Sequence, residues 1–158
     1  MFKKYQGGFS IIEVIMVLGL VGLVVGFGAS GYQVWQKNIH LNNVRDEIKS
    51  SLFRAQQLAT AAAKSNPWGV HLEVDSYTIF KGNFYNEDDP DNMSWQLEGV
   101  EILEPYRSFD DGAGSTTADV LFGKFDGQTI NTGIISLSPI ADPALIKTIE
   151  VEAPGQIN

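Results

Sequence analysis

The chain has 158 residues, 44% of them apolar and 19% charged, which is enough for one compact domain and one further element. Cysteine is absent, which excludes disulfides, thiolate nucleophiles and Cys-based zinc sites. Residues 1–64 contain seven Lys or Arg against three Asp or Glu, and residues 65–158 contain four against sixteen, a net −12. Because proteins bind nucleic acid largely through Lys and Arg, no nucleic-acid partner is expected for the distal part.

The chain opens with a short basic segment that contains Lys3 and Lys4 and ends in Gly8. From Phe9 to Ala29 the only charge is Glu13, and a helix of this length would rise about 31 Å, which matches the hydrocarbon core of a bilayer. We therefore expect this stretch to cross the inner (cytoplasmic) membrane once. The two lysines would keep the N-terminus in the cytoplasm, so that the acidic part lies outside it.

A second helical pattern follows, in which apolar residues recur at spacings of three and four and would form one buried face. These residues are Leu41, Val44, Ile48, Leu52, Ala55, Ala59 and Ala62. Pro67 is expected to stop the helix. No turn signal separates the two patterns, so they predict one continuous helix, and the alternative is a break around Gly26, Gly28 and Gly31.

Beyond Pro67 the chain changes to short alternating or β-branched runs separated by polar turns, which predict antiparallel strands. The predicted strands are Val70–Val74, Tyr77–Lys81, Trp95–Leu103, Val120–Phe125, Ile134–Ser138 and Ile146–Val151. In the first of them, alternation places His71 and Glu73 toward solvent. The fold class is therefore α+β, with the amphipathic half of a long N-terminal helix packed on a C-terminal antiparallel sheet.

The N-terminal segment resembles the type IV pilin and type II secretion pseudopilin family. The resemblance rests on the basic leader, Gly8, the aromatic Phe9 and the acidic Glu13, which matches the fifth residue of the mature chain in that family. It implies a pilin-like fold and a cut between Gly8 and Phe9 by a prepilin peptidase, which also N-methylates Phe9. It further implies that Glu13 of one subunit pairs with the new α-amino group of Phe9 on a neighbour.

Four segments follow from this interpretation: a leader at 1–8, a membrane and assembly helix at 9–31, an amphipathic helix at 32–64 and a β-rich head at 65–158. Residues 45–82, with Arg54–Ala59 and the first two predicted strands, resemble more loosely the minor pseudopilins of GspH/FimT type. The resemblance implies a minor structural subunit of a type IV pilus or a secretion pseudopilus. Its partners would be other pilin subunits.

Two further functions stay open at this point, a DNA-binding competence pilin and a membrane-anchored receptor or enzyme. The sequence contains no nucleophile elbow, phosphate-binding loop or paired carboxylates in a signature context, so we expect no enzyme. No cofactor is expected either. The acidic run from Glu87 to Asn92 and the pair Asp110-Asp111 offer oxygen ligands, and calcium is the alternative to a solvated acidic loop there.

Overall fold

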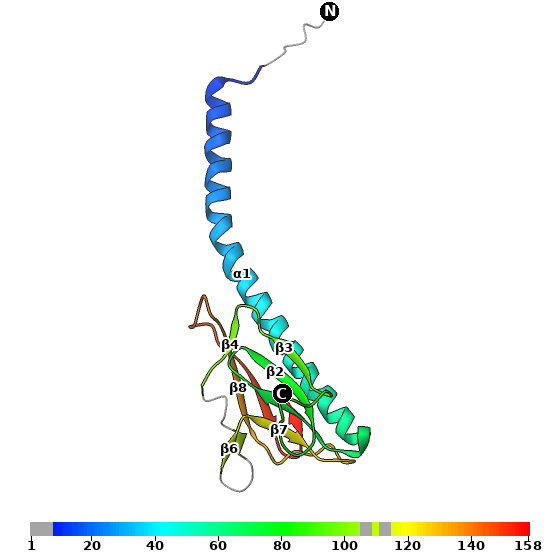
Figure 1. Cartoon of the computed structure of the whole chain (residues 1–158). Coiled ribbons are helices and arrows are strands. Elements are labelled where there is room, and N and C mark those ends of the chain that lie inside the picture. The colour runs from blue at the N-terminus through cyan, green and yellow to red at the C-terminus, as the bar shows by residue number, and fades with distance from the viewer. Residues whose placement is uncertain (1–7, 105–108, 111–114) are drawn as a thin grey trace, which may run out of the picture. The chain divides into compact units, whose positions relative to one another are not determined.

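The computed structural model describes residues 8–104, 109–110 and 115–158, and it leaves the side chains of residues 27–31 and 33–34 undescribed. The chain forms two compact units, Met1–Lys37 and Asn38–Asn158, which we call the N-terminal unit and the body unit. Figure 1 shows the elements of both. The N-terminal unit is helical where it is described, and the body unit combines a helical segment with antiparallel strands.

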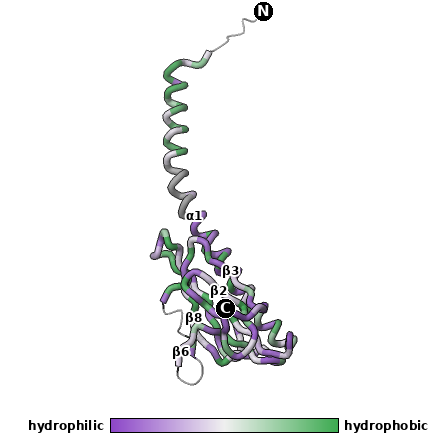
Figure 2. Tube along the Cα trace, in the orientation of Figure 1, coloured by the Kyte–Doolittle hydropathy of each residue, from purple (hydrophilic) through white to green (hydrophobic). Residues whose placement is uncertain are grey.

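Helix α1 (Ile11–Thr60) is assigned as one element, and its N-terminal part is apolar (Figure 2). The predicted membrane span within it is wrong, because the described residues contain no helix that is long and apolar enough to cross a membrane.

This finding also corrects the predictions that depended on the span. Three predictions required a helix that spans the bilayer: the long N-terminal helix with a transmembrane half, the transmembrane and pilin descriptors, and the single-pass location in the inner membrane. The described residues contain no such helix, so these predictions are wrong. The α+β composition itself agrees with the observed elements.

In the body unit, the predicted apolar face of α1 is buried. Six of its seven residues belong to the core, namely Leu41, Val44, Ile48, Leu52, Ala55 and Ala59. The seventh, Ala62, is half-buried and adopts a left-handed conformation with φ 49°. The helix therefore ends at Thr60, before the predicted stop at Pro67, and a short 3-10 turn (Ala63–Ser65) follows it.

In the described part of the body unit, ten strands form three antiparallel sheets. The first has the order β3 (Met93–Gln96), β2 (Ser76–Lys81), β1 (Trp68–Leu72) and β7 (Asp119–Phe122). The second has the order β10 (Gln156–Ile157), β9 (Lys147–Glu152), β8 (Gly133–Pro139) and β4 (Val100–Ile102). The third pairs β5 (Phe109–Asp110) with β6 (Thr116–Thr117). Side chains from all three sheets and from the buried face of α1 form one hydrophobic core.

The predicted strand Trp95–Leu103 is divided between two sheets, because the chain turns at Gly99. This residue has φ +69°, a backbone conformation that residues other than glycine adopt only with steric strain. The break leaves Trp95 in β3 and Val100 in β4. His40 of the helix contacts the same turn, with its Nε2 atom 2.7 Å from the carbonyl oxygen of Glu98.

A buried tyrosine links the helix to the first sheet. Tyr77 stacks on Trp95 with ring centroids 5.4 Å apart, and its hydroxyl donates to Glu47 Oε1 at 3.0 Å. Burial is the main reason why the pKa of Tyr77 rises to about 12, and the carboxylate of Glu47 adds to the rise, whereas a hydrogen bond from Ser51 opposes it. The hydroxyl therefore stays protonated at neutral pH and remains a hydrogen-bond donor to the helix.

Two glycines with similar φ provide a matched test of packing against the helix. Gly99 has open space where a Cβ atom would lie, whereas a Cβ atom on Gly127 (φ +64°) would lie 2.4 Å from Thr60 Oγ1. We expect Gly99→Ala to lower the free energy of unfolding by about 1 kcal/mol through backbone strain. Gly127→Ala should lower it by about 3 kcal/mol, because steric overlap is added. Urea unfolding of the full chain measures both, and equal losses would show that the close approach to Thr60 is unimportant.

Candidate functional site

The three residues singled out from the sequence lie together at the start of α1. The carbonyl oxygen of Ser10 accepts hydrogen bonds from the backbone N–H groups of Glu13 (3.0 Å) and Val14 (3.2 Å), which forms the first helical turn. A serine followed by a glutamate three residues later is a common helix start, and a carboxylate there is favoured by the helix dipole. Glu13 therefore lies in the first turn of the helix. Its carboxylate avoids the free-energy cost that a charge in the middle of an apolar helix would carry.

Phe9 and Glu13 line the same shallow groove, whose volume is about 280 Å³. Its other lining residues, Val14, Val17 and Leu18, are apolar. Gly8 is exposed, and no atom lies within 4 Å of the point where a Cβ atom on it would sit, so the backbone before Phe9 is accessible. The structure thus brings the predicted residues together on an open surface.

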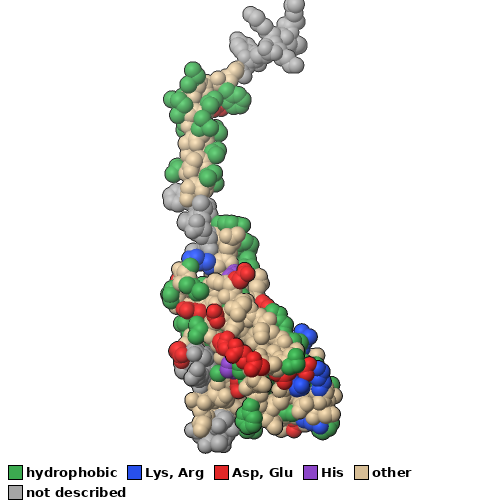
Figure 3. Space-filling model, in the orientation of Figure 1, with side chains coloured by type: hydrophobic (Ala, Val, Ile, Leu, Met, Phe, Trp, Pro, Cys, Tyr) green, Lys and Arg blue, Asp and Glu red, His purple; other side chains and the backbone are tan. Residues whose placement is uncertain are grey.

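The surface that continues from this groove is apolar on all sides. Every described residue from Gly8 to Gly26 is exposed, and the large side chains are between 47% and 83% exposed. Figure 3 shows hydrophobic side chains around this part of the chain, whereas Asp and Glu side chains gather on the visible face of the body unit. A helix that is apolar on every face is stable only when other surfaces cover it.

In the acidic loop after β2, the run from Glu87 to Asn92, some carboxylates are paired with lysines, so the loop is not solvated throughout. Asp91 accepts hydrogen bonds from Lys64 and Lys81, the latter at 2.6 Å, and Lys81 also lies 3.7 Å from Asp89. Two ammonium groups thus lie against Asp89 and Asp91, two of the four carboxylates in the run from Glu87 to Asn92. Among the described residues, no group of three or more acidic or histidine side chains is arranged to hold a metal ion. Asp111 lies outside the described residues.

The prediction that His71 points to solvent is wrong. Its side chain is 20% exposed, its Nδ1 atom lies 2.6 Å from Asp119 Oδ1, and its ring stacks on Tyr85 at 4.0 Å between centroids. The reason is the pairing of β1 with β7, which places Asp119 directly opposite His71. Alternation within one strand gives the side of the sheet but not the partner on the neighbouring strand. Glu73 is exposed, as predicted.

Comparisons with protein-family models, with curated proteins and with solved structures find no match to this chain. The functional argument therefore depends on the geometry of the chain itself.

The lysine pairing of Asp91 predicts a defined acid sensitivity. Hydrogen bonds from Lys64 and Lys81 lower the pKa of Asp91 below its usual 3.8, so the folded state favours the ionised form. Because the pKa of Asp91 is lower in the folded state than in the unfolded state, its ionised carboxylate stabilises the fold at pH values above the unfolded-state pKa. This stabilisation is lost as the pH falls below about 4. Urea unfolding of Asp91→Asn should therefore show a deficit that is constant from pH 7 to 5 and shrinks toward pH 3.

Asp88→Asn is the matched control, because Asp88 is exposed in the same loop and no ion pair of its carboxylate is found among the described residues. It should leave the stability unchanged across this pH range. A deficit of Asp91→Asn that persists unchanged at pH 3 would contradict the assigned role of the ion pairs.

Proposed function

We propose that this chain is a structural subunit of a pilin-like filament, released by cleavage after Gly8 and assembled through the N-terminal part of α1. The filament would be a type IV pilus or a secretion pseudopilus, with this chain as a minor subunit. The observation that carries the proposal is the fully exposed apolar helix, whose first turn contains an isolated carboxylate. The helices of other subunits, apolar in the same way, would cover this exposed surface.

The position of Glu13 relative to Phe9 supports a role in assembly. Cleavage before Phe9 would create an α-amino cation four residues ahead of Glu13, on the same groove. Opposite charges 4 Å apart gain about 4 kcal/mol at an effective dielectric constant of 20. When apolar helices surround the groove, this carboxylate is stable only next to a cation, from its own chain or from a neighbour. Such pairing would fix the axial position of one subunit against the next.

The charge of the chain beyond the helix gives no support to a DNA-binding role. Residues 65–158 carry a net −12, and Figure 3 shows carboxylates spread over one face of the body unit. Phosphate groups are attracted by Lys and Arg and repelled by such a surface. A filament subunit needs no such attraction.

The cleavage step is tested by changing the residue before the cut. Gly8→Leu should block processing, because a bulky side chain prevents close approach of the extended backbone to a protease. The full chain and the variant are co-expressed with a prepilin peptidase, and intact mass is measured. The unchanged chain should begin at methylated Phe9 and the variant at Met1. Processing of the variant at the normal rate would refute the assigned cleavage site.

The assembly step is tested separately by changing the carboxylate. Glu13→Gln keeps size and hydrogen bonding but removes the charge, so processing should be normal while incorporation into filaments falls at least tenfold. Incorporation is measured by immunoblotting of sheared filaments from cells that carry the remaining subunits. Glu73→Gln, an exposed carboxylate of the body unit, is the control and should incorporate normally. Normal incorporation of Glu13→Gln would exclude a role for this charge.

A further inference from the structure

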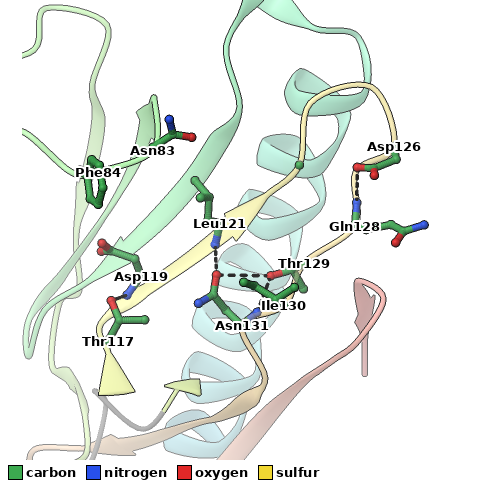
Figure 4. A pocket seen from close by; sticks show the side chains of 11 residues that line it. Asn83, Phe84, Thr117, Asp119, Leu121, Asp126, Gln128, Thr129, Ile130 and Asn131 are labelled. Carbon is green, nitrogen blue, oxygen red and sulfur yellow. Dashed lines mark hydrogen bonds between the residues drawn. The ribbon is translucent and has the colours of Figure 1, made fainter. Parts of the chain in front are cut away.

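A second hollow lies in the body unit, along the outer edge of β7, with a volume of about 520 Å³. This volume is within the range of about 300–1,000 Å³ found for ligand sites. Its walls come from the loop after β2, from β7 and its approach, and from the turn that follows β7 (Figure 4). Three separate segments thus converge on one hollow.

The edge of β7 cannot accept an additional strand in the usual way, because its outward N–H groups are already bonded. The N–H of Asp119 donates to Thr117 Oγ1 at 3.1 Å, and that of Leu121 donates to Asn131 Oδ1 at 2.9 Å. The N–H of Gly123 donates to the carbonyl oxygen of Gln128 at 2.7 Å. A ligand in the hollow therefore contacts side chains rather than extending the sheet.

Asn131 presents an unused donor to this hollow. Its side chain lines the hollow although the residue is only 5% exposed, and its Oδ1 atom accepts from Leu121. This bond fixes the orientation of the amide, so its Nδ2 atom is the remaining donor. No acceptor for Nδ2 is found among the described residues, and Figure 4 shows the nitrogen turned toward the side of Thr117 and Asp119. The Nδ2 atom is therefore available to an acceptor on a ligand.

The charge and shape of the hollow define the rest of the ligand. Asp119 and Asp126 are both lining residues, none of the described lining residues is Lys or Arg, and Figure 4 places the two carboxylates toward opposite ends. The walls also include the apolar residues Phe84 and Ile130, which are 84% and 69% exposed. The five residues from Asp119 to Gly123 span about 13 Å when extended, which is the length of a short extended peptide.

We propose that this hollow binds a short extended segment of a partner protein that carries Lys or Arg side chains about four residues apart. The cationic groups lie against Asp126 and against Asp119, whose Oδ1 atom also contacts His71 Nδ1 at 2.6 Å. The aliphatic stems cover Phe84 and Ile130. A backbone carbonyl of the segment accepts from Asn131 Nδ2. Arg and Lys combine an apolar stem with a cationic end, which is the combination that these walls complement.

The test uses the full chain and a fluorescent peptide, Arg-Ala-Ala-Ala-Arg, with Glu-Ala-Ala-Ala-Glu as the reverse-charge control, in anisotropy titrations. The Arg peptide should bind at least tenfold more tightly than the Glu peptide, and its affinity should fall as salt rises from 50 to 300 mM. Equal affinities of the two peptides would overturn the proposal.

Variants then assign the binding to this hollow. Asp126→Asn and Phe84→Ala should each weaken binding about fivefold, and together at least twentyfold. Both side chains are exposed, so the fold should persist, which near-ultraviolet circular dichroism checks. Asp88→Asn and Ile140→Ala, exposed residues that do not line the hollow, should change the affinity less than twofold.

Two results would contradict the proposal at this stage. One is a double variant that binds the Arg peptide as tightly as the unchanged chain does. The other is displacement of the peptide by a neutral oligosaccharide, maltotetraose, at lower concentration than by unlabelled Arg peptide, which would assign the hollow to sugars. Neither result depends on cleavage at Gly8 or on Glu13, so the filament proposal is tested independently.

Discussion

The body unit depends on the burial of one helix face. The first and second sheets form separate hydrogen-bonded layers, and the face of α1 from Leu41 to Ala59 contributes to the core that contains residues of both. At about 1.5–3 kcal/mol for each large apolar side chain buried, the aliphatic residues of this face contribute most of what the helix adds to stability. Without it, neither sheet would have a complete apolar cover on its inner side.

Polar contacts determine how the loops lie against this core. His40 contacts the turn at Gly99, Glu47 accepts from buried Tyr77, and Lys64 after the helix bonds Asp91 of the acidic loop. Each contact ties the helix or its end to a different part of the β-rich region. The contrast with the N-terminal unit is direct: there, the described side chains of α1 from Ile11 to Gly26 are exposed and lack a comparable apolar cover.

Sequence reasoning succeeded where the signal is local. The spacing of Leu41, Ile48 and Leu52 predicted the buried face of the helix, and five of the six predicted strands lie within three residues of an observed strand. The short strands β5, β6 and β10 were not predicted. It failed where the outcome depends on distant partners or on backbone conformation. The pairing of His71 with Asp119, the use of lysines around Asp91 and the division of a strand at Gly99 all belong to these cases.

The membrane span shows a different kind of error. The span was predicted from the hydropathy of the run after Phe9, but the described residues contain no helix that is long and apolar enough to cross a membrane. The predicted site at Gly8, Phe9 and Glu13 came from a motif, and its members do lie together, but their roles remain proposals. The hollow beside β7 had no sequence signal, because its walls come from segments that only the sheet topology brings together.

The side-chain amide of Gln56 has a consequence for the order of folding. It donates to the carbonyl oxygens of Gly127 and Gly155, which lie 71 and 99 positions further along the chain. The helix is therefore synthesised well before the groups that its buried side chains and this amide require. A nascent chain that has not yet reached Gly155 exposes the apolar helix face, and the body unit completes its core only once these later residues have left the ribosome.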